Sequence, residues 1–413
     1  MQAQLGAAFP AFCAALGEPP KKALHINTLK TDRNALSALL DLPLPVLPEN
    51  PDGAPLPLTF NPNAAPLHAA GLFYMQEATA QAPVAALDLP DEPVVLDLCA
   101  APGGKSAQLA AKMRGGVLFS NEIVPSRAEV LAGNLERMGV VNAIVTNAEP
   151  KTVCDRLSAR CDAVLVDAPC AGESMFRKDE QAVRDWSPEH VETCAVRQRA
   201  ILEEAQKAVK PGGTLVYSTC SFSLQENEET VRYFLDRHTD FLLVSMRRLY
   251  PHTSAGEGQF FAVLARNGER VPAAFSTGRS DRVPAFEAFS EQVRLPAGQL
   301  RLLKDGRVLL LPAMPFPFDG VKLVRAGLLL GEVKGSRFEP AHALALAGGE
   351  TPFFRRCELS FDEAMRYLRG ETLPKDAEKG YGAAMYRGHA LGLYKASDGM
   401  LKNHYPKGLR LLK

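Results

Sequence analysis

Two cysteines that each follow a short apolar run could carry out sulfur chemistry together. The run 163–166 is followed by Asp167 and then Cys170, and the run 214–217 is followed by Cys220. Val-rich runs of this kind predict buried parallel strands, whose carboxyl ends open on a shared crevice. We therefore expect the two thiols to lie at one edge of a sheet, and this pair predicts a reaction that uses two sulfurs.

The elements that would position these thiols alternate between strand and helix patterns from residue 94 onward. Such alternation predicts a doubly wound α/β sheet. The expected strands are 94–98, 117–120, 143–146, 163–166 and 214–217, and the expected helices are 106–113, 126–138 and about 189–209. Ser126 is expected to cap the second helix, and Pro211-Gly212-Gly213 to end the third. Residues 241–246 and 260–265 are expected to close the sheet as an antiparallel edge pair.

The turn after the first expected strand has the composition of a ligand-binding loop. It consists of Cys99, Ala100, Ala101, Pro102, Gly103, Gly104 and Lys105. Glycines let a ligand approach the backbone closely, and the helix behind them offers free N–H groups. The alternative is a simple strand-to-helix turn. The loop lacks the G-x-G-x-x-G pattern, which argues against a nicotinamide dehydrogenase.

Acidic residues follow three further strands. Glu122 ends the second strand, where an acid can bind a ribose hydroxyl, while Glu149 follows the third strand and Asp167 the fourth. Each could also be an exposed loop carboxylate. Together they favour a ligand with an adenosine end and no phosphate. S-adenosylmethionine fits, because acids favour its cationic sulfonium.

The charge balance excludes a uniformly basic nucleic-acid-binding protein. Lys plus Arg and Asp plus Glu each number 47. An RNA partner would therefore have to meet a local patch. The stretch 381–413 is a candidate, with interleaved basic and aromatic residues and Asp398 as its only acid: Arg387, Lys395, Lys402, Lys407, Arg410, Lys413, Tyr381, Tyr386, Tyr394 and Tyr405. Such a pattern is typical of RNA contacts, and the alternative is a solvated C-terminal face.

The eight cysteines do not form a metal-binding pattern. No two have C-x-x-C spacing and no histidine cluster accompanies them, so we expect no metal and free thiols in a reducing compartment. No apolar run reaches the roughly 18 residues of a membrane span. Residues 1–16 make a poor secretory signal. The expected location is the cytoplasm, and the expected state is a monomer.

These motifs together resemble the Nol/Nop/Sun family of RNA cytosine-5 methyltransferases. The family motifs D-x-C-A-A-P-G-G-K, D-A-P-C and S-T-C are present at 97–105, 167–170 and 218–220, and Glu226-Asn227-Glu228 follows the last of them. The N-T-L-K of 27–30 and the Y-x-Q-E of 74–77 match N-terminal family elements. The tail K-N-H-Y-P-K-G at 402–408 resembles the PUA-like region of the bacterial small-subunit (16S) rRNA methyltransferase F group.

Three positions depart from the family pattern. His25 stands where the family usually has Arg, which would weaken an N-terminal RNA contact. Ser174 replaces a common Gly. Residues 147–149 replace an Asp-containing loop, so Glu149 is chosen as the adenine-side acid by its spacing from Asp167.

The resemblance implies a Rossmann-like class I methyltransferase fold in three parts. These are an N-terminal RNA-binding α/β extension (1–70), a methyltransferase domain (71–266) and a small C-terminal PUA-like α+β region (293–413). S-adenosylmethionine would be bound by 99–105, Glu122, Arg127, Glu149 and Asp167. The implied substrate is RNA of the small ribosomal subunit; alternatives are tRNA, or a catalytically silent RNA-binding protein.

The resemblance also implies roles for the two thiols. Cys220 would add to carbon 6 of cytosine, and Cys170 would assist its release. Asp167 would hold the target base, or donate to ring nitrogen 3 in its protonated form, and Lys105 is a candidate for the cation that activates Cys220. A DNA cytosine methylase takes its nucleophile from the first cysteine motif, so Cys220 argues against that class.

The cytosine would have to be flipped or single-stranded to expose carbon 6. Two basic residues next to the first cysteine motif, Arg177 and Lys178, could hold RNA phosphates. The alternative for them is a solvated loop.

Overall fold

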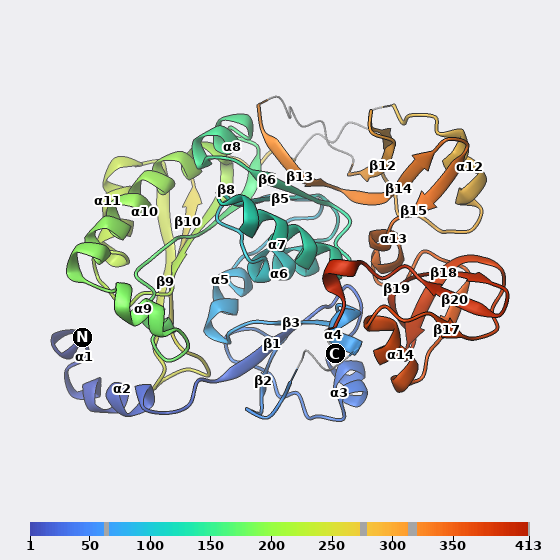
Figure 1. Ribbon diagram of the computed structural model, residues 1–413. Helices are drawn as coiled ribbons and strands as arrows, with labels where there is room; N and C mark the ends of the chain where they lie inside the picture. The colour runs from blue at the N-terminus through green and yellow to red at the C-terminus, as the bar shows by residue number, and fades with distance from the viewer. Residues whose placement is uncertain (62–65, 273–278, 313–319, 412–413) are drawn as a thin grey trace.

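The computed structural model describes residues 1–61, 66–272, 279–312 and 320–411 (Figure 1). At its centre is an eight-stranded sheet of order β13-β6-β5-β4-β7-β8-β10-β9. The parallel strands are β4 (Val94–Asp97), β5 (Val117–Asn121), β6 (Ala143–Asn147), β7 (Cys161–Asp167) and β8 (Val209–Thr219). The predicted doubly wound α/β sheet is confirmed.

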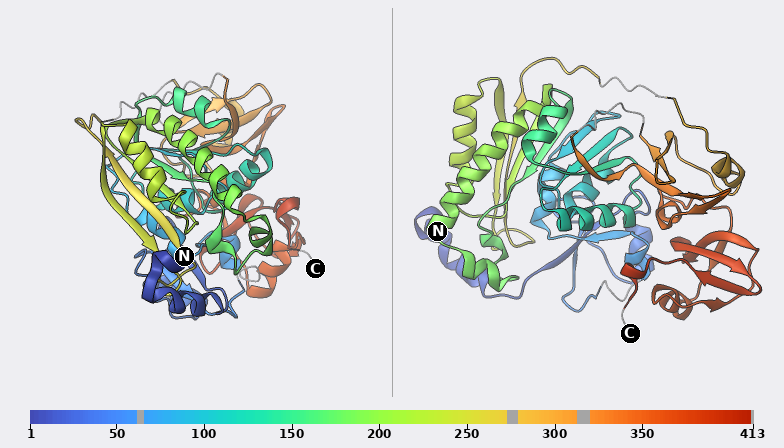
Figure 2. Two further views of the ribbon diagram at one scale, coloured as in Figure 1. Left: turned by 90° about the vertical axis from the view of Figure 1, so that its left-hand side faces the viewer. Right: turned by 45° about the horizontal axis from the view of Figure 1, so that its top comes forward.

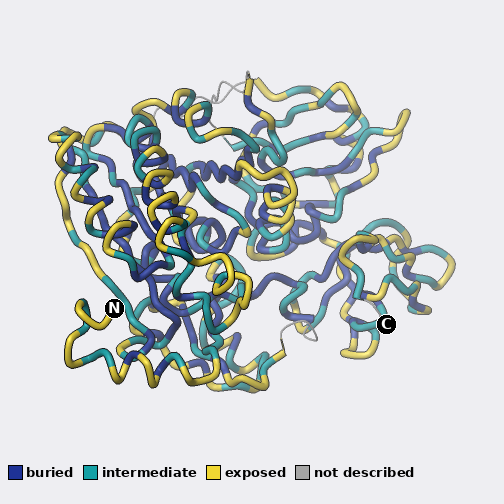
Figure 3. The backbone as a smooth tube through the Cα atoms, turned by 60° about the vertical axis from the view of Figure 1, so that its left-hand side comes forward, coloured by how far each residue is buried: buried dark blue, intermediate teal, exposed yellow. Residues whose placement is uncertain are grey.

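The helices cover both faces of this sheet, because alternate residues of each buried strand point to opposite sides. Leu96 belongs to the core on one side and Val95 to the core on the other. The first core includes residues of α8 (Pro150–Arg156), α10 (Pro188–Ala208) and α11 (Glu228–Arg237). The second includes residues of α5 (Ala82–Ala85), α6 (Gly104–Lys112) and α7 (Pro125–Arg137). Figure 3 shows this buried centre in dark blue.

The closing strands β9 (Phe241–Leu249) and β10 (Gln259–Arg266) form the predicted antiparallel edge pair beside β8. The other edge was not predicted. There β13 (Lys322–Ala326), which comes from the C-terminal third of the chain, pairs antiparallel with β6. The C-terminal region therefore completes the sheet that carries the candidate site.

Two predicted helix boundaries are wrong. Helix α7 begins at Pro125, its N-cap is Val124, and Ser126 lies inside its first turn. Proline is favoured at the first helical position because it has no N–H to leave unpaired. Residues 211–213 lie within β8, because α10 already ends at Ala208 and the chain becomes extended at Val209.

The N-terminal extension has a three-stranded antiparallel sheet of order β2-β1-β3. Its strands are β1 (Lys22–Ile26), β2 (Gly53–Leu56) and β3 (Phe73–Met75), and its helices are α1 (Gln2–Leu5), η1 (Gly6–Ala8), α2 (Phe9–Leu16), α3 (Arg33–Leu40) and α4 (Pro66–Ala69). His25 is only 2% exposed, and its Nδ1 lies 3.2 Å from Asn50 Nδ2. His25 is therefore a buried residue of this sheet, and the expected weakening of an RNA contact by the change from Arg to His stays a prediction.

The N-T-L-K segment joins the extension to the end of α7. The Asn27 amide donates to the carbonyls of Gly71 (2.7 Å) and Met138 (2.8 Å). Lys30 Nζ donates to the carbonyls of Ala70 (2.8 Å) and Arg137 (3.2 Å). These are carbonyls that a helix end leaves unpaired, and a cation is favourable there. The segment matched a family motif, and its contacts here are structural.

The C-terminal region consists of two small sheets (Figure 2, right). The first has the order β11-β12-β14-β15 and the second β16-β18-β19-β20-β17. Their strands are β11 (Gln299–Leu302), β12 (Arg307–Leu311), β14 (Leu328–Lys334), β15 (Arg337–Pro340), β16 (Arg356–Glu358), β17 (Leu373–Pro374), β18 (Gly380–Tyr386), β19 (His389–Ser397) and β20 (Met400–Asn403). The helices of this region are α12 (Pro284–Ser290), α13 (His342–Leu346) and α14 (Phe361–Leu368).

Two of the four tyrosines expected to stack on RNA bases are core residues instead. Tyr394 is 2% exposed and Tyr405 is 8% exposed. Tyr381 remains half-buried at the surface, with Lys395 Nζ 4.8 Å from its ring centre and His404 5.5 Å away. Tyr386 is also half-buried.

Among the described residues, no helix has the length and apolar character needed to cross a bilayer. In the same part of the chain, no group of three or more His, Cys, Asp or Glu side chains is placed to hold a metal ion.

Candidate active site

The two cysteines singled out by the sequence lie side by side. β7 and β8 are parallel neighbours, so the loops that follow them leave the same edge of the sheet. The sulfur atoms of Cys170 and Cys220 are 3.1 Å apart, and both residues are half-buried. The backbone N–H of Ser174 donates to the Cys220 carbonyl at 3.0 Å and joins the two loops.

The environment makes the two thiols unequal. A hydrogen bond from the Cys170 thiol lowers the pKa of Cys220, and Lys105 lowers it further against the opposing effects of burial and Asp167. The same hydrogen bond, together with burial, raises the pKa of Cys170 well above its usual value. Cys220 is therefore the thiol of the pair that ionises more readily, and a thiolate is the reactive form of cysteine.

Asp167 and Lys105 form an ion pair next to the sulfurs, with 2.8 Å between Lys105 Nζ and Asp167 Oδ2. Burial disfavours the charge on Lys105, but the contact with Asp167 outweighs it and raises the pKa of the lysine. The other Asp167 oxygen accepts from Ser218 Oγ at 2.7 Å and from Gln259 Nε2 at 3.3 Å. Asp167 is therefore held by side chains from α6, β8 and β10, and its two expected roles toward the base stay predictions.

Two carboxylates hold the cysteine-bearing loops together. Glu226 is fully buried and accepts from the Ala171 N–H and the Gln198 amide, each at 2.9 Å, and from the Ser221 hydroxyl. Glu173 accepts from the Phe222 N–H at 2.5 Å and from the same Ser221 hydroxyl at 3.1 Å. The sequence motifs include Glu226 only as part of the run 226–228, and Glu173 was not selected from the sequence.

The loop 99–105 runs from β4 into α6 and is fixed from α7. Asn134 Nδ2 donates to the Pro102 carbonyl at 2.9 Å, and Arg127 donates to the Ala101 carbonyl at 3.0 Å. Gly103 has φ 111°, in the left-handed region where a side chain would be strained. A Cβ at Gly104 would approach the Tyr74 ring to 3.1 Å. Both glycines are therefore required by the backbone and its neighbours.

Glu122 follows β5 and lies beside Arg127, the residue that also contacts the 99–105 loop. Its side chain is 4% exposed, accepts from the Val124 N–H at 2.9 Å and lies 3.4 Å from Arg127. Glu149 is exposed and stands immediately before α8. Asn147, the last residue of β6, donates to the Glu122 carbonyl at 2.8 Å, so the segment before Glu149 contacts Glu122 although Glu149 itself is exposed.

Asp97, which lies just before the loop 99–105, was not selected from the sequence as a site residue. It ends β4 and is fully buried; one oxygen accepts from Ser106 Oγ at 2.7 Å, and Oδ1 has no partner among the described residues. Burial raises the pKa of Asp97 to about 7. The sequence feature that could have identified Asp97 is its position as the acid at the end of the first strand, just before the loop.

Arg177 was expected either to hold phosphate or to lie in a solvated loop, and both alternatives are wrong. Its side chain is 6% exposed and forms an ion pair with Glu257, whose side chain is 1% exposed. Arg177 also donates to the carbonyls of Ala15 (2.7 Å) and Glu18 (3.1 Å). Lys178 Nζ lies 3.6 Å from Glu257. This segment therefore fastens the N-terminal extension to the β9–β10 loop.

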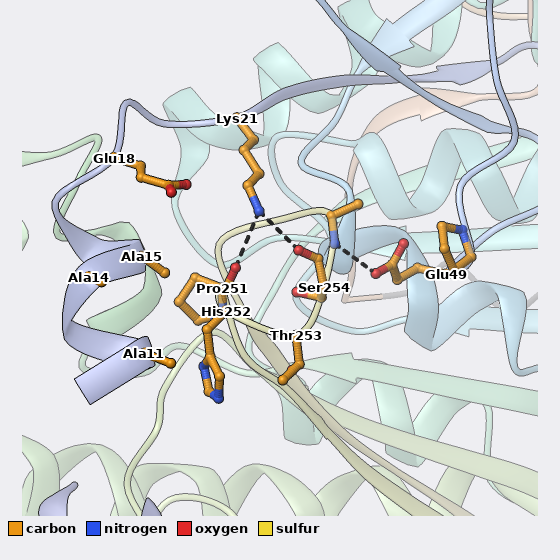
Figure 4. Close-up of a pocket in the computed structure, with 12 residues that line it drawn as sticks. Ala11, Ala14, Ala15, Glu18, Lys21, Glu49, Pro251, His252, Thr253 and Ser254 are labelled. Carbon is orange, nitrogen blue, oxygen red and sulfur yellow. Dashed lines mark hydrogen bonds between the residues drawn. The ribbon is translucent and has the colours of Figure 1, made fainter. Parts of the chain in front are cut away.

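A hollow of about 600 Å³ lies where the N-terminal extension meets that loop (Figure 4). Lys21 Nζ donates to the carbonyls of Pro251 (3.2 Å) and Ser254 (3.0 Å), and the Ala255 N–H donates to Glu49 (3.1 Å). None of the candidate catalytic residues lines it. Its walls hold the loop that leads into Gln259, which reaches Asp167.

Four family models match consecutive parts of the chain. They are described as the N-terminal domain of 16S rRNA methyltransferase RsmF (residues 1–78), 16S rRNA methyltransferase RsmB/F (84–265), the RsmF first C-terminal domain (288–347) and the methyltransferase RsmF PUA domain (354–411).

Curated relatives match over nearly the whole chain. The chain is 34% identical to a protein of Cronobacter sakazakii named ribosomal RNA small subunit methyltransferase F, covering 98% of this chain and 93% of the relative. It is also 34% identical to the protein of that name from Klebsiella pneumoniae, covering 98% and 95%.

Solved structures resemble the central part of the fold. A methyltransferase homologue from Pyrococcus horikoshii is 28% identical, with a TM-score of 0.56 over 63% of this chain and 91% of that one. NSun6 from the same organism, solved with SFG, is 20% identical, with a TM-score of 0.55 over 65% and 97%. The NSun6 structure, at this identity, shows that the two proteins share a fold.

Proposed function

The chain belongs to the RsmB/F family of 16S rRNA methyltransferases, and from this premise we propose that it methylates carbon 5 of a cytosine in 16S rRNA. The resemblance drawn from the motifs is confirmed for the small-subunit methyltransferase F group. The observation that carries the choice of cytosine carbon 5 is the pair of sulfurs 3.1 Å apart at the end of β7 and β8.

We place S-adenosylmethionine, the cofactor of this family, beside the end of β4, where it would supply an electrophilic methyl group. The unpartnered Oδ1 of buried Asp97 and the buried carboxylate of Glu122 suit a ligand with hydroxyl and cationic groups. Gly103 and Gly104 let the loop lie close against Leu131 and Tyr74. We assign cofactor binding to residues 99–105, Glu122 and Asp97, with Arg127 holding the loop and Glu149 at the rim.

Carbon 5 of cytosine is a poor nucleophile because it belongs to an aromatic ring. When the Cys220 thiolate forms a bond to carbon 6, aromaticity is lost and carbon 5 gains the electron density of an enamine. The Cys170 thiol and the Lys105 cation are the groups placed to stabilise that thiolate before the bond forms, against the opposing charge of Asp167. Asp167, one-third exposed at its side chain, is placed to hold the base from the same edge.

Release requires two further changes after carbon 5 carries the methyl group. The carbon 5 proton must pass to a base, and the bond between carbon 6 and sulfur must break to restore the ring and the Cys220 thiolate. Cys170 is the group in contact with Cys220, and we assign it the proton transfer or the assistance to this elimination.

The substrate is proposed from the relatives and the C-terminal region. The relatives are named for the small subunit, and residues 354–411 match a PUA domain. Half-buried Tyr381 with Lys395 provides an aromatic and a cationic group for RNA in this region. A ribosomal substrate agrees with a cytoplasmic location.

The test is bisulfite sequencing of 16S rRNA and tRNA from cells with and without the gene, combined with single-cysteine variants in vitro. Cys220→Ala is expected to abolish methyl transfer while cofactor binding is retained. Cys170→Ala is expected to remain covalently attached to RNA on a denaturing gel, and Cys13→Ala, at an exposed cysteine, serves as the unaffected control. A Cys170→Ala enzyme that turns over freely without an adduct would contradict the role assignment, and modification of tRNA alone would contradict the substrate.

A further inference from the structure

Trp186 is an exposed aromatic residue attached to the catalytic loops. It is the only tryptophan of the sequence and lies between α9 (Glu180–Asp185) and α10. It is 40% exposed, yet its indole N–H donates to Glu173 at 3.0 Å. The ring is therefore held in place while a large part of its surface faces solvent.

The partner of Trp186 connects it directly to the nucleophile loop. The second oxygen of Glu173 accepts from the N–H of Phe222 at 2.5 Å and from the hydroxyl of Ser221 at 3.1 Å, and these two residues follow Cys220. Ser174, next to Glu173, donates its N–H to the Cys220 carbonyl. The Glu173 carboxylate thus connects the indole to the backbone that follows the candidate nucleophile.

The position of Trp186 also suits a purely structural role. Ser187 caps α10, so Trp186 occupies the position before the cap, where an apolar residue often packs against the fourth helical residue, here buried Val191. Such packing needs an apolar side chain at this position. It does not require an indole N–H bound to the catalytic loop, nor an aromatic surface left in water.

We propose that Trp186 is the stacking platform for a nucleotide adjacent to the target cytosine, with Glu173 as the residue that orients it. This inference rests on the proposed function. A cytosine that leaves its stack to reach Cys220 also exposes the faces of its neighbours, and proteins bind such unstacked bases on aromatic side chains. A ring fixed by Glu173 offers this surface without first having to be ordered.

The substitutions separate stacking from packing. Trp186→Leu keeps an apolar side chain at the position before the cap and removes the aromatic face, whereas Trp186→Phe keeps a ring and removes the N–H. Stacking on an aromatic residue contributes about 1–3 kcal/mol per base. Trp186→Leu is therefore expected to raise the KM for an unmodified 16S rRNA transcript by about tenfold, with the KM for S-adenosylmethionine and the melting temperature unchanged. Trp186→Phe is expected to show a smaller rise.

Because there is one tryptophan, its fluorescence reports on this site alone. Titration of the wild-type protein with the same transcript is expected to quench the emission, with a midpoint that matches the binding curve from filter retention. Glu173→Gln should weaken both the quenching and the RNA affinity. The inference would be overturned if Trp186→Leu had the KM of the wild type, or if the tryptophan emission did not change on RNA binding. In either case, methyl transfer by the wild type would leave the proposed function intact. Absence of transfer by the wild type would overturn both.

Discussion

Lys105 and Lys30 are both half-buried lysines within family motifs, and they differ in what surrounds them. Lys105 faces the carboxylate of Asp167, which raises its pKa. Within the part of the chain that the structure describes, Lys30 donates to the carbonyls of Ala70 and Arg137, and burial followed by the nearby Arg137 charge lowers its pKa to about 7. A lysine with a carboxylate keeps its charge and can act on a neighbouring thiol. A lysine among carbonyls holds two segments together, so a shared motif does not by itself mark chemistry.

The largest expected effect comes from removing the first of these cations. Lys105→Met takes away the charge that lowers the pKa of Cys220 and leaves Asp167 without its partner. A rise of one to two units in that pKa would reduce the thiolate at neutral pH by about 10–100-fold, and kcat should fall by at least that factor. The check is single-turnover methyl transfer together with the pH dependence of Cys220 alkylation. An unchanged alkylation profile would remove Lys105 from the activation of the thiol.

The matching substitution at the second lysine should affect stability instead. Lys30→Met leaves the carbonyls of Ala70 and Arg137 without a donor, and we expect a loss of about 1–3 kcal/mol in the free energy of unfolding. The rate constant of methyl transfer per folded molecule should stay within twofold of the wild type. Urea denaturation and active-site titration measure the two quantities. A large drop in kcat at full stability would contradict the distinction between the two lysines.

The region around Lys30 should also make the protein sensitive to acid. Burial lowers the pKa of His68 to about 3 and that of His342 to about 4, and nearby positive charges contribute to both shifts. Below the usual pKa of 6.5 the unfolded state binds protons that the folded state excludes, so stability falls as pH drops from 6.5 toward 4. His342→Asn should make the midpoint of urea denaturation depend less steeply on pH between about 6.5 and 4. An identical slope would exclude His342 as a contributor.

The smallest effect is expected where a carboxylate is exposed. Glu122 is buried beside Arg127, whereas Glu149 is exposed at the rim of the same crevice. Glu122→Gln should weaken S-adenosylmethionine binding by about tenfold, and Glu149→Gln by only about threefold, because solvent screens an exposed charge. Calorimetric titration of both variants tests the order. Equal losses would show that the 147–149 loop closes over the ligand.

The parts of the fold that the sequence predicts are those with a local signal. Val-rich runs identify β4 to β8, and because β7 and β8 are parallel neighbours, the meeting of Cys170 and Cys220 could be expected before the structure. Arg177 could not be placed in this way, because its partner Glu257 lies 80 residues away. The burial of Tyr394 likewise depends on how a small β-domain packs. Strand β13 has a half-exposed, mixed pattern, and nothing near it in the chain shows that β6 is its partner.

Strand β13 has a consequence for how the protein is made. The edge of β6 that it covers stays open until residues 322–326 have left the ribosome, although the rest of that sheet has been synthesised by residue 266. An open edge of this kind invites pairing with other chains. A fragment that stops after β10 should therefore aggregate, and the nascent chain must wait for its last third before its catalytic sheet is sealed.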